Sequence, residues 1–444
     1  MRLLLLAFVI CAVTHAAAPQ QDRHVIVVSL DGFPAYMLQD PHLPLPVLRR
    51  LIREGGVADG MKPVNPAVTW PNHTAMVTGV NAARHGVIYN GLPVREGDGK
   101  PIRVEPWIDQ TTLVQAKTVY QAAHDAGLTT AEVDWVAIYR SAAVNWSFAE
   151  QPRADGPVEK EMIQQGLISQ DDILSFGKAP ITWRDDLWTR AAAYILEHHR
   201  PNLLLMHLLT TDSVQHQYGA RSLAAQTALI LADRQLQRIL DAVERAGIQK
   251  QTTLLVVSDH GFKTNQHVIK PNALLREKGL LKGEENQIDC DAWVVAEGGT
   301  AMVYVTREAR REATLRVLKE AFSSVRGITK VILPDEYEQY GYPKVVPQGR
   351  MSDMVLVAQP GYAFAASTTG EVVSDVAAGS TPGNHGYLNS DPDMNEILVA
   401  WGAGIRPGSH TGLVPNIDVA STIAHLLHVD LPDSQGHPLL DLLQ

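Results

Sequence analysis

Cysteine is nearly absent from this chain, which contains two in 444 residues. Cys11 lies in an apolar N-terminal run that we expect to be removed, so the mature chain keeps only Cys290. One cysteine can form no internal disulfide, which excludes the class of small exported domains that are stapled by disulfides. The fold must therefore be held together by its hydrophobic core.

Long hydrophobic runs are also missing, apart from one at the N-terminus. There a basic start precedes the run LLLLAFVICAV, and the small residues of THAAA follow it. This pattern predicts a secretory signal peptide over residues 1–18, cleaved after Ala16, Ala17 or Ala18. An uncleaved anchor is the alternative, but the run is shorter than the ~20 residues that a membrane span needs. We therefore expect a secreted or periplasmic protein with no membrane span after cleavage; its oligomeric state stays open.

The chain lacks an excess of positive charge and any linker-like segment. Its formal net charge is -10, and no block of Lys and Arg stands out, which argues against binding to nucleic-acid polymers. Small phosphate-containing substrates such as nucleotides remain possible. No internal repeat or Ser- or Pro-rich linker divides the chain. We therefore expect one catalytic domain over residues 22–444, with loop insertions, rather than two domains.

What the chain does contain is a series of short apolar runs that end in polar residues or glycine. Runs of this kind, buried on both faces, are typical of parallel sheets. The strands that we predict are 24–30, 128–135, 202–209, 252–257, 301–305, 354–358 and 396–400, and the helices are 43–54, 111–126, 184–199, 224–247, 271–279, 307–322 and 414–427. Their alternation predicts an α/β sandwich with a mostly parallel central sheet flanked by helices.

Three aspartates occupy equivalent places, each at or just past the end of a predicted strand. They are Asp31, Asp212 and Asp259. In open α/β sheets ligands bind at the carboxyl ends of the strands, so these three side chains can converge on one crevice. A single aspartate after a strand usually stabilises a turn, but three aspartates in this pattern indicate a ligand-binding site.

Histidines accompany two of these aspartates. His216 follows Asp212 by four residues, which places both side chains on one face of a helix, and His260 is adjacent to Asp259. His385 lies between glycines that permit close approach to a ligand. Carboxylate oxygens together with imidazole nitrogens suit Zn²⁺ and its neighbours among the transition metals.

Most of the other histidines are expected to be structural or solvated. This interpretation applies to His24, His73, His85, His207, His425 and His428.

The stretch 68–90 contains the residue that we expect to be the nucleophile. Thr69 precedes Pro71 and a short helix that ends at Thr78-Gly79. Free N–H groups at a helix N-terminus favour an anion such as phosphate. Taken alone, Thr69 is better explained as a helix cap or a turn residue than as a nucleophile. A hydroxyl becomes a nucleophile only when a base or a metal activates it, so the metal site decides between these interpretations.

The motifs in order and spacing resemble one family. They are Asp31-Gly32, Thr69-Trp70-Pro71-Asn72-His73, Thr78-Gly79, His85-Gly86, Asp212-x-x-x-His216, Asp259-His260-Gly261 and Gly383-x-His385-Gly386. Together they resemble the nucleotide pyrophosphatase/phosphodiesterase family of the alkaline phosphatase superfamily, over nearly all of the mature chain. The resemblance implies an alkaline-phosphatase-like fold and two zinc ions. One ion would be held by Asp212, His216 and His385, and the other by Asp31, Asp259 and His260 with the Thr69 hydroxyl.

The resemblance also assigns two residues to substrate binding. Asn90 matches the family's asparagine that binds a non-bridging phosphate oxygen, although a turn residue before Gly91 fits the local sequence as well. Trp70 replaces the usual phenylalanine beside the nucleophile, where an aromatic ring can stack on a substrate or belong to the core. The segments 136–182 and 283–300 are expected to shape specificity.

The implied chemistry is hydrolysis of a phosphate diester or pyrophosphate through a covalent phospho-threonine. A monoesterase needs strong positive charge for a dianionic phosphate, and no Arg or Lys adjoins Thr69. A sulfatase needs a C/S-x-P-x-R motif, which Thr69 to His73 does not provide. A phosphomonoesterase or phosphonate hydrolase of the same superfamily is the alternative. A non-catalytic metal-binding protein is a more remote one, because neither ligand nor nucleophile is missing.

Overall fold

The computed structural model describes residues 22–377 and 379–444. The predicted signal peptide, residues 1–18, lies outside this range. The centre of the fold is an eight-stranded sheet, whose strands lie in the order β21-β2-β20-β8-β1-β7-β5-β6. The strands are β1 (His24–Leu30), β2 (Gly56–Lys62), β5 (Thr130–Val133), β6 (Trp146–Phe148), β7 (Leu203–Leu208), β8 (Thr252–Val257), β20 (Leu398–Gly402) and β21 (Ser409–Pro415).

This sheet is mostly parallel, as the sequence predicts. Both neighbours of β1 run parallel to it, and β20 is the strand that runs against its neighbours. The middle strands β7 and β8 are buried along their whole length, which explains why they appear in the sequence as unbroken apolar runs rather than alternating ones.

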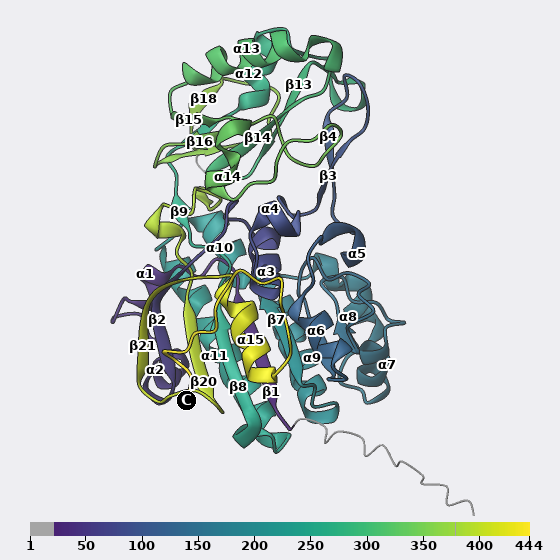
Figure 1. Ribbon diagram of the computed structural model, residues 1–444, viewed down its shortest axis with the longest axis vertical. Helices are drawn as coiled ribbons and strands as arrows, with labels where there is room; N and C mark the ends of the chain where they lie inside the picture. Colours follow the sequence, from purple (N-terminus) through teal and green to yellow (C-terminus); the bar gives the residue numbers. More distant parts are fainter. Residues whose placement is uncertain (1–21, 378) are drawn as a thin grey trace, which may run out of the picture.

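Helices cover both faces of the sheet (Figure 1). One face packs against α2 (Pro46–Glu54), α7 (Pro157–Gln164), α8 (Gln170–Ser175), α9 (Ile181–His198) and α11 (Leu223–Arg245). The other packs against α3 (Thr69–Thr78), α6 (Val119–Asp125) and α15 (Asp418–Leu427). Alternate residues of β1 enter the two cores: Ile26 and Val28 one, Val25 and Val27 the other.

Between β8 and β20 the chain leaves the main sheet and builds a second, antiparallel sheet in the order β13-β14-β16-β15. Figure 1 shows this sheet in the upper lobe, above the ends of the main strands. Its strands are β13 (Ala292–Ala296), β14 (Thr300–Val305), β15 (Ile328–Ile332) and β16 (Met354–Ala358), accompanied by α12 (Pro271–Glu277), α13 (Arg311–Ser323) and α14 (Tyr337–Tyr340). The description of residues 22–444 as one catalytic domain stays a prediction.

The chain also contains shorter elements that belong to neither of these two sheets. They are α1 (Ala35–Leu38), α4 (Ala82–His85), β3 (Leu92–Arg95), β4 (Ile102–Glu105), α5 (Gln110–Leu113), α10 (Thr210–Tyr218), β9 (Lys263–Thr264), β10 (His267–Ile269), β11 (Leu281–Lys282), β12 (Asp289–Cys290), β17 (Tyr362–Phe364), β18 (Val373–Asp375) and β19 (Gly383–Asn384). None of the helices in the described part of the chain is long and apolar enough to span a bilayer.

Two local predictions were wrong. The helix expected over 111–126 is two helices, α5 and α6, because the Thr118 side chain accepts the Gln121 N–H and starts a new helix with a capping box. The strand β2 was not predicted, because Gly56 and Gly60 interrupt its apolar pattern. It forms because β20 and β21 pair with it on either side.

Candidate functional site

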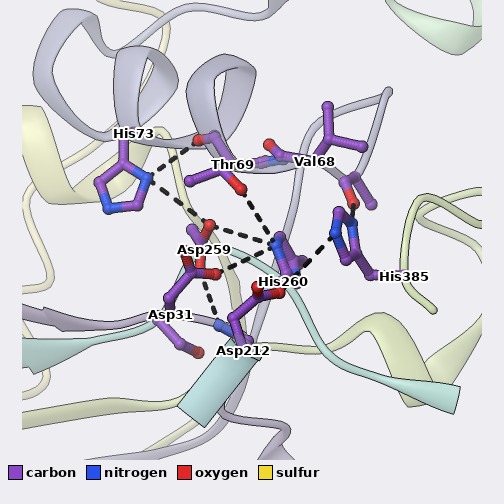
Figure 2. A network of polar contacts seen from close by, with 12 residues as sticks. Asp31, Val68, Thr69, His73, Asp212, Asp259, His260 and His385 are labelled. Carbon is purple, nitrogen blue, oxygen red and sulfur yellow. Dashed lines mark hydrogen bonds and ion pairs between the residues drawn. The ribbon is translucent and has the colours of Figure 1, made fainter. Parts of the chain in front are cut away.

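The three predicted aspartates lie together at the carboxyl ends of adjacent strands. Asp31 follows β1, Asp259 follows β8, and Asp212 stands in the first turn of α10, directly after β7. Because these strands are neighbours in the order β8-β1-β7 and run parallel, their ends meet at one edge of the sheet. Figure 2 shows the three carboxylates side by side below Thr69.

Imidazoles complete two groups of possible metal ligands. In the first, Asp31 and Asp259 each place a carboxylate oxygen 3.3 Å from Nε2 of His260. In the second, Asp212 meets His385, with 3.8 Å between Oδ1 and Nε2, and His260 again lies within reach. The rings of His260 and His385 stack with their centroids 3.7 Å apart, so His260 borders both groups.

His216 lies at the outer side of the second group. Its Nε2 is 3.3 Å from Oδ1 of Asp212, in the i, i+4 relation predicted from the sequence. The three residues around Asp212 whose ligand atoms all lie within 4.8 Å of one another nevertheless include His260 rather than His216. The structure thus brings all six predicted Asp and His ligands together, and the division of these residues between two ions stays a prediction.

Each of these imidazoles is oriented by a backbone carbonyl. Nδ1 of His216 contacts Gly383 O at 2.9 Å, Nδ1 of His260 contacts Gly261 O at 3.1 Å, and Nδ1 of His385 contacts Ala67 O at 3.2 Å. A carbonyl oxygen can only accept, so Nδ1 carries a hydrogen, and Nε2, which faces the carboxylates, is the nitrogen that can bind a metal ion when the imidazole is neutral. This orientation is the one that metal-binding histidines adopt.

The donor set fits metal ions, because its inward-facing atoms have no other partner. Oδ1 of Asp31, Oδ1 of Asp212 and Oδ2 of Asp259 are buried oxygens without a hydrogen bond among the described residues. They face imidazole nitrogens, and a bound cation would stabilise a buried group of carboxylates and imidazoles of this kind. Carboxylate oxygen and imidazole nitrogen are ligands that zinc accepts.

Burial and mutual charge shift the protonation of these groups. Burial, reinforced by nearby acidic groups, raises the pKa of Asp31 and Asp259 well above the usual value. Burial also lowers the pKa of His260, so this imidazole is neutral, as a metal ligand must be. For Asp212 and His216 burial opposes ionisation, but their mutual attraction outweighs it: the pKa of Asp212 falls and that of His216 rises to about 9.

Thr69 lies next to these carboxylate and imidazole groups. Its Oγ1 is 3.5 Å from Nε2 of His260, and Figure 2 shows the hydroxyl directed at the ligand groups. The sequence placed Thr69 just before a helix and Trp70 outside α conformation. Both are in fact the first residues of α3, with Val68 as the N-cap. Pro71 is tolerated because the N–H groups of a first turn have no partner within the helix.

Asn90 is tied to the start of this helix. Its Oδ1 accepts the Trp70 N–H at 2.9 Å. That bond fixes the amide, and the Asn90 Nδ2 group has no hydrogen-bond partner among the described residues, nor does the Thr69 N–H. Two N–H donors are therefore available beside the Thr69 hydroxyl, which is the arrangement that developing negative charge on a phosphate requires.

A cavity of about 380 Å³ lies beside Trp70. Trp107, Trp135 and Tyr139 also line it, with most of its other residues drawn from the segment 132–159. This overlaps the segment 136–182 that the sequence associates with specificity. The second such segment, 283–300, does not line this cavity.

Sequence reasoning passed over two histidines that belong to the site's surroundings. His207, expected to be structural, places Nε2 2.9 Å from Oδ2 of Asp31. His73 places Nδ1 3.6 Å from Oδ2 of Asp259, and its ring packs edge-on against His207. The signal for His207 was present: it is the one polar residue in the apolar strand that leads to Asp212.

Comparisons with known proteins identify the family and several relatives. The family described as type I phosphodiesterase / nucleotide pyrophosphatase matches residues 25–388. Ectonucleotide pyrophosphatase/phosphodiesterase family member 7 of Mus musculus is 23% identical over 442 residues, covering 98% of this chain and 90% of that protein. The bis(5'-adenosyl)-triphosphatase of Xenopus laevis is 21% identical and covers 95% of this chain and 81% of that protein.

Solved structures show the same fold. Murine ectonucleotide pyrophosphatase/phosphodiesterase 5 superposes with a TM-score of 0.72 at 19% identity, covering 95% of this chain and all of that one (100%). An inactive threonine-to-alanine variant of that murine protein, solved in complex with AMP, superposes equally well. Because the family match spans most of the chain, from β1 to just beyond His385, the chain belongs to the type I phosphodiesterase/nucleotide pyrophosphatase family of hydrolases.

Proposed function

We propose that this protein is an exported, two-zinc phosphodiesterase or nucleotide pyrophosphatase in which Thr69 is the nucleophile. The observation that carries the proposal is the set of inward-facing, unpartnered carboxylate oxygens directly below the Thr69 hydroxyl. The residues proposed to hold the ions are Asp31, Asp259, His260 and Thr69 for one, and Asp212, His216 and His385 for the other. When bound, two such ions supply positive charge that lowers the pKa of a neighbouring hydroxyl and offsets charge on the leaving oxygen.

The chain's own groups perform the remaining steps. Oγ1 of Thr69 attacks phosphorus and forms a covalent Thr–O–P bond while the bond to the leaving oxygen breaks. Water then attacks the same phosphorus, which releases the product and restores the hydroxyl. Throughout, Asn90 Nδ2 and the Thr69 N–H donate to the non-bridging oxygens.

A diester or pyrophosphate fits the surroundings of Thr69 better than a monoester. Asn90 is neutral, and no Lys or Arg of the described residues forms an ion pair with the ligand carboxylates. The cavity beside Trp70 offers aromatic surface to a second substituent. The AMP complex of the murine protein supports a nucleotide as that substituent. The relatives' ectoenzyme names agree with the predicted export of this chain.

Replacing Thr69 by alanine tests the nucleophile. Thr69→Ala should fold and retain metal but hydrolyse bis(p-nitrophenyl) phosphate at a negligible rate, whereas Thr69→Ser keeps a hydroxyl and should retain measurable turnover. Zinc content and diesterase rate are measured on the same samples. A near-normal rate in Thr69→Ala would remove Thr69 from this role.

Comparing two chromogenic substrates tests the reaction class. The wild type should prefer bis(p-nitrophenyl) phosphate over p-nitrophenyl phosphate by at least about tenfold in kcat/KM, or roughly 1.4 kcal/mol of transition-state binding. The monoester carries close to two charges near neutral pH, since its second pKa is about 6. A preference for the monoester would replace this proposal by the phosphomonoesterase alternative.

A further inference from the structure

His207 stands directly behind one of the proposed metal ligands. It is fully buried near the end of β7, between Asp31, which follows β1, and Asp134, which follows β5. Its Nε2 is 2.9 Å from Oδ2 of Asp31. Its Nδ1 is 3.2 Å from the backbone oxygen of Asp134 and 3.5 Å from Oδ2 of the same residue. His207 thus links the ends of three neighbouring strands.

The contact with Asp31 is a hydrogen bond whose direction depends on the charge of Asp31. A metal ligand is an ionised carboxylate, whose oxygens only accept, so in the metal-bound site Nε2 of His207 carries the hydrogen and donates it to Oδ2. The other oxygen of Asp31, Oδ1, has no hydrogen bond and lies 3.3 Å from Nε2 of His260. The two oxygens are therefore differentiated: one is held by His207 and the other is presented to the cluster.

Asp134 holds the far side of the imidazole by an unusual backbone conformation. It has a φ of 57°, in the left-handed region that Asp tolerates better than most residues. In this conformation both its carbonyl and its carboxylate face His207. The Asp134 carboxylate is fully buried and makes no hydrogen bond with the described residues, and burial raises its pKa. Strain of this kind is retained where a functional arrangement depends on it.

Packing restricts the ring further. The His73 ring meets the His207 ring edge-on at 4.3 Å between centroids, and the Trp135 ring packs edge-on against His73 at 4.7 Å. The imidazole of His207 therefore has little room to rotate away from Asp31.

We infer that His207 is a positioning residue, held by Asp134, whose Nε2–H fixes Asp31 so that Oδ1 of Asp31 faces the metal. The inference rests on the proposed two-metal function. Partners behind a ligand typically change metal affinity or activity by 10- to 100-fold when they are replaced. The weakening should affect the ion of the Asp31, Asp259 and His260 group and leave the ion beside Asp212 in place.

Three substitutions of His207 test the inference. Gln extends its amide to about the place of Nε2 and can still donate to Asp31, whereas Asn, one methylene shorter, reaches only the place of Nδ1. His207→Leu fills the space without a donor. Zinc affinity is measured by competition with a chelating dye, together with zinc stoichiometry and thermal unfolding. We expect one zinc to bind about 10- to 100-fold more weakly in His207→Leu and His207→Asn, and His207→Gln to stay within about threefold of the wild type.

A matched control is His24→Leu. His24 starts the neighbouring strand β1 at the opposite end of the sheet and bonds to Pro201 O through Nδ1 at 2.8 Å. Its loss should leave zinc affinity unchanged. If His207→Leu does not fold, comparing the zinc affinities of His207→Asn and His207→Gln still tests the inference. Both variants keep a polar side chain, but only the longer Gln side chain extends to Asp31.

The outcomes separate the inference from the function on which it rests. If the wild type binds two zinc ions and His207→Leu or His207→Asn binds both with wild-type affinity, the positioning role is wrong. Equal weakening in His207→Gln and His207→Asn would also overturn it, since reach to Asp31 would then not matter. If the wild type binds no zinc, the proposed function itself fails.

Discussion

At the scale of single residues, the site is defined by which atoms lack partners. Buried oxygens of Asp31, Asp212 and Asp259 face imidazole nitrogens, and the amide nitrogen of Asn90 is left without a partner at the start of the helix that carries Thr69. Other unpaired polar atoms occur elsewhere in the described interior, although an unpaired buried group is costly. What distinguishes the site is that several unpaired carboxylate oxygens lie close to imidazole nitrogens, a donor set that suits a metal ion.

Asn90 should contribute through its N–H group. Asn90→Ala removes that donor and should lower kcat/KM for bis(p-nitrophenyl) phosphate by about 10²-fold, as loss of an oxyanion-hole donor does. Asn90→Asp keeps an acceptor for the Trp70 N–H but offers no donor, so its loss should be at least as large. Steady-state kinetics with thermal unfolding as a folding control decide this. If Asn90→Asp were as active as the wild type, the amide could not be the phosphate donor.

Glu132 should make stability depend on pH. Burial raises its pKa from 4.5 to about 7, and its oxygens accept from Ser147 and from the Trp135 N–H. As the pH rises from about 4.5 to 7, the unfolded chain releases this proton while the folded chain retains it, so Glu132 makes stability fall through that window.

Replacement of Glu132 by glutamine should remove this contribution. The Gln side chain keeps an oxygen that can accept as Glu132 does and an amide group that can bond to the Ser147 hydroxyl, but it does not titrate. The difference in unfolding free energy between Glu132→Gln and wild type should shift by up to about 3 kcal/mol in favour of the variant between pH 5 and 8. Urea titrations at both pH values, at one zinc concentration, measure it; parallel pH profiles would contradict the assignment.

At the scale of elements, short segments aim the functional groups. The helix α3 carries Thr69 at its first position and ends at Gly79, a left-handed C-cap with φ of 69°. The turn between β13 and β14 holds the other side of the site, because the Gly299 N–H donates to the His385 carbonyl at 2.8 Å. The second sheet thus supports one of the proposed ligands.

Substitution of Gly79 should destabilise the helix that carries Thr69. A Cβ there would collide with the side chain of Ser434, in addition to the strain of a positive φ. Gly127, with a φ of 80° and open space around it, is the control for strain alone. Gly127→Ala should cost about 1 kcal/mol and Gly79→Ala clearly more, as measured by urea unfolding. Equal costs would show that Ser434 moves aside freely.

At the scale of the whole molecule, the order of the strands creates the site. The strands β8, β1 and β7 lie side by side although they come from distant parts of the chain, and each delivers an acidic residue to the same edge. Without cations this edge would gather three largely buried carboxylates, which repel one another and lose hydration.

Metal removal should therefore weaken the entire fold. A chelator should lower the Tm of the wild type, and added zinc should restore it, because ions that bind only the folded chain stabilise it by about 4 kcal/mol each at 1,000 times Kd. Differential scanning fluorimetry with and without chelator measures the shift. The difference in Tm with and without chelator should be smaller in Asp212→Asn than in the wild type. If neither chelator nor zinc changed the wild-type Tm, metal binding would not be coupled to the stability of the fold.

The sequence by itself determined the sheet and the position of its chemistry. The strand over 252–257 forms as predicted, because a buried parallel strand is a local apolar run, and the carboxyl ends of such strands mark Asp31, Asp212 and Asp259. The local sequence pattern did not predict β2, whose two glycines interrupt its apolar residues. This strand forms because β20 and β21, distant in the chain, pair with it.

Only the tertiary structure decided how the side chains meet. It placed His260 between two ligand groups, set the Asn90 amide by the Trp70 N–H, and put His207 between Asp31 and Asp134. These contacts join residues that are far apart in the chain, such as His207 and Asp31, which are 176 positions apart. Periodicity encodes which face of a strand is buried, but not which partner lies across it, because that depends on the packing of all neighbouring elements at once.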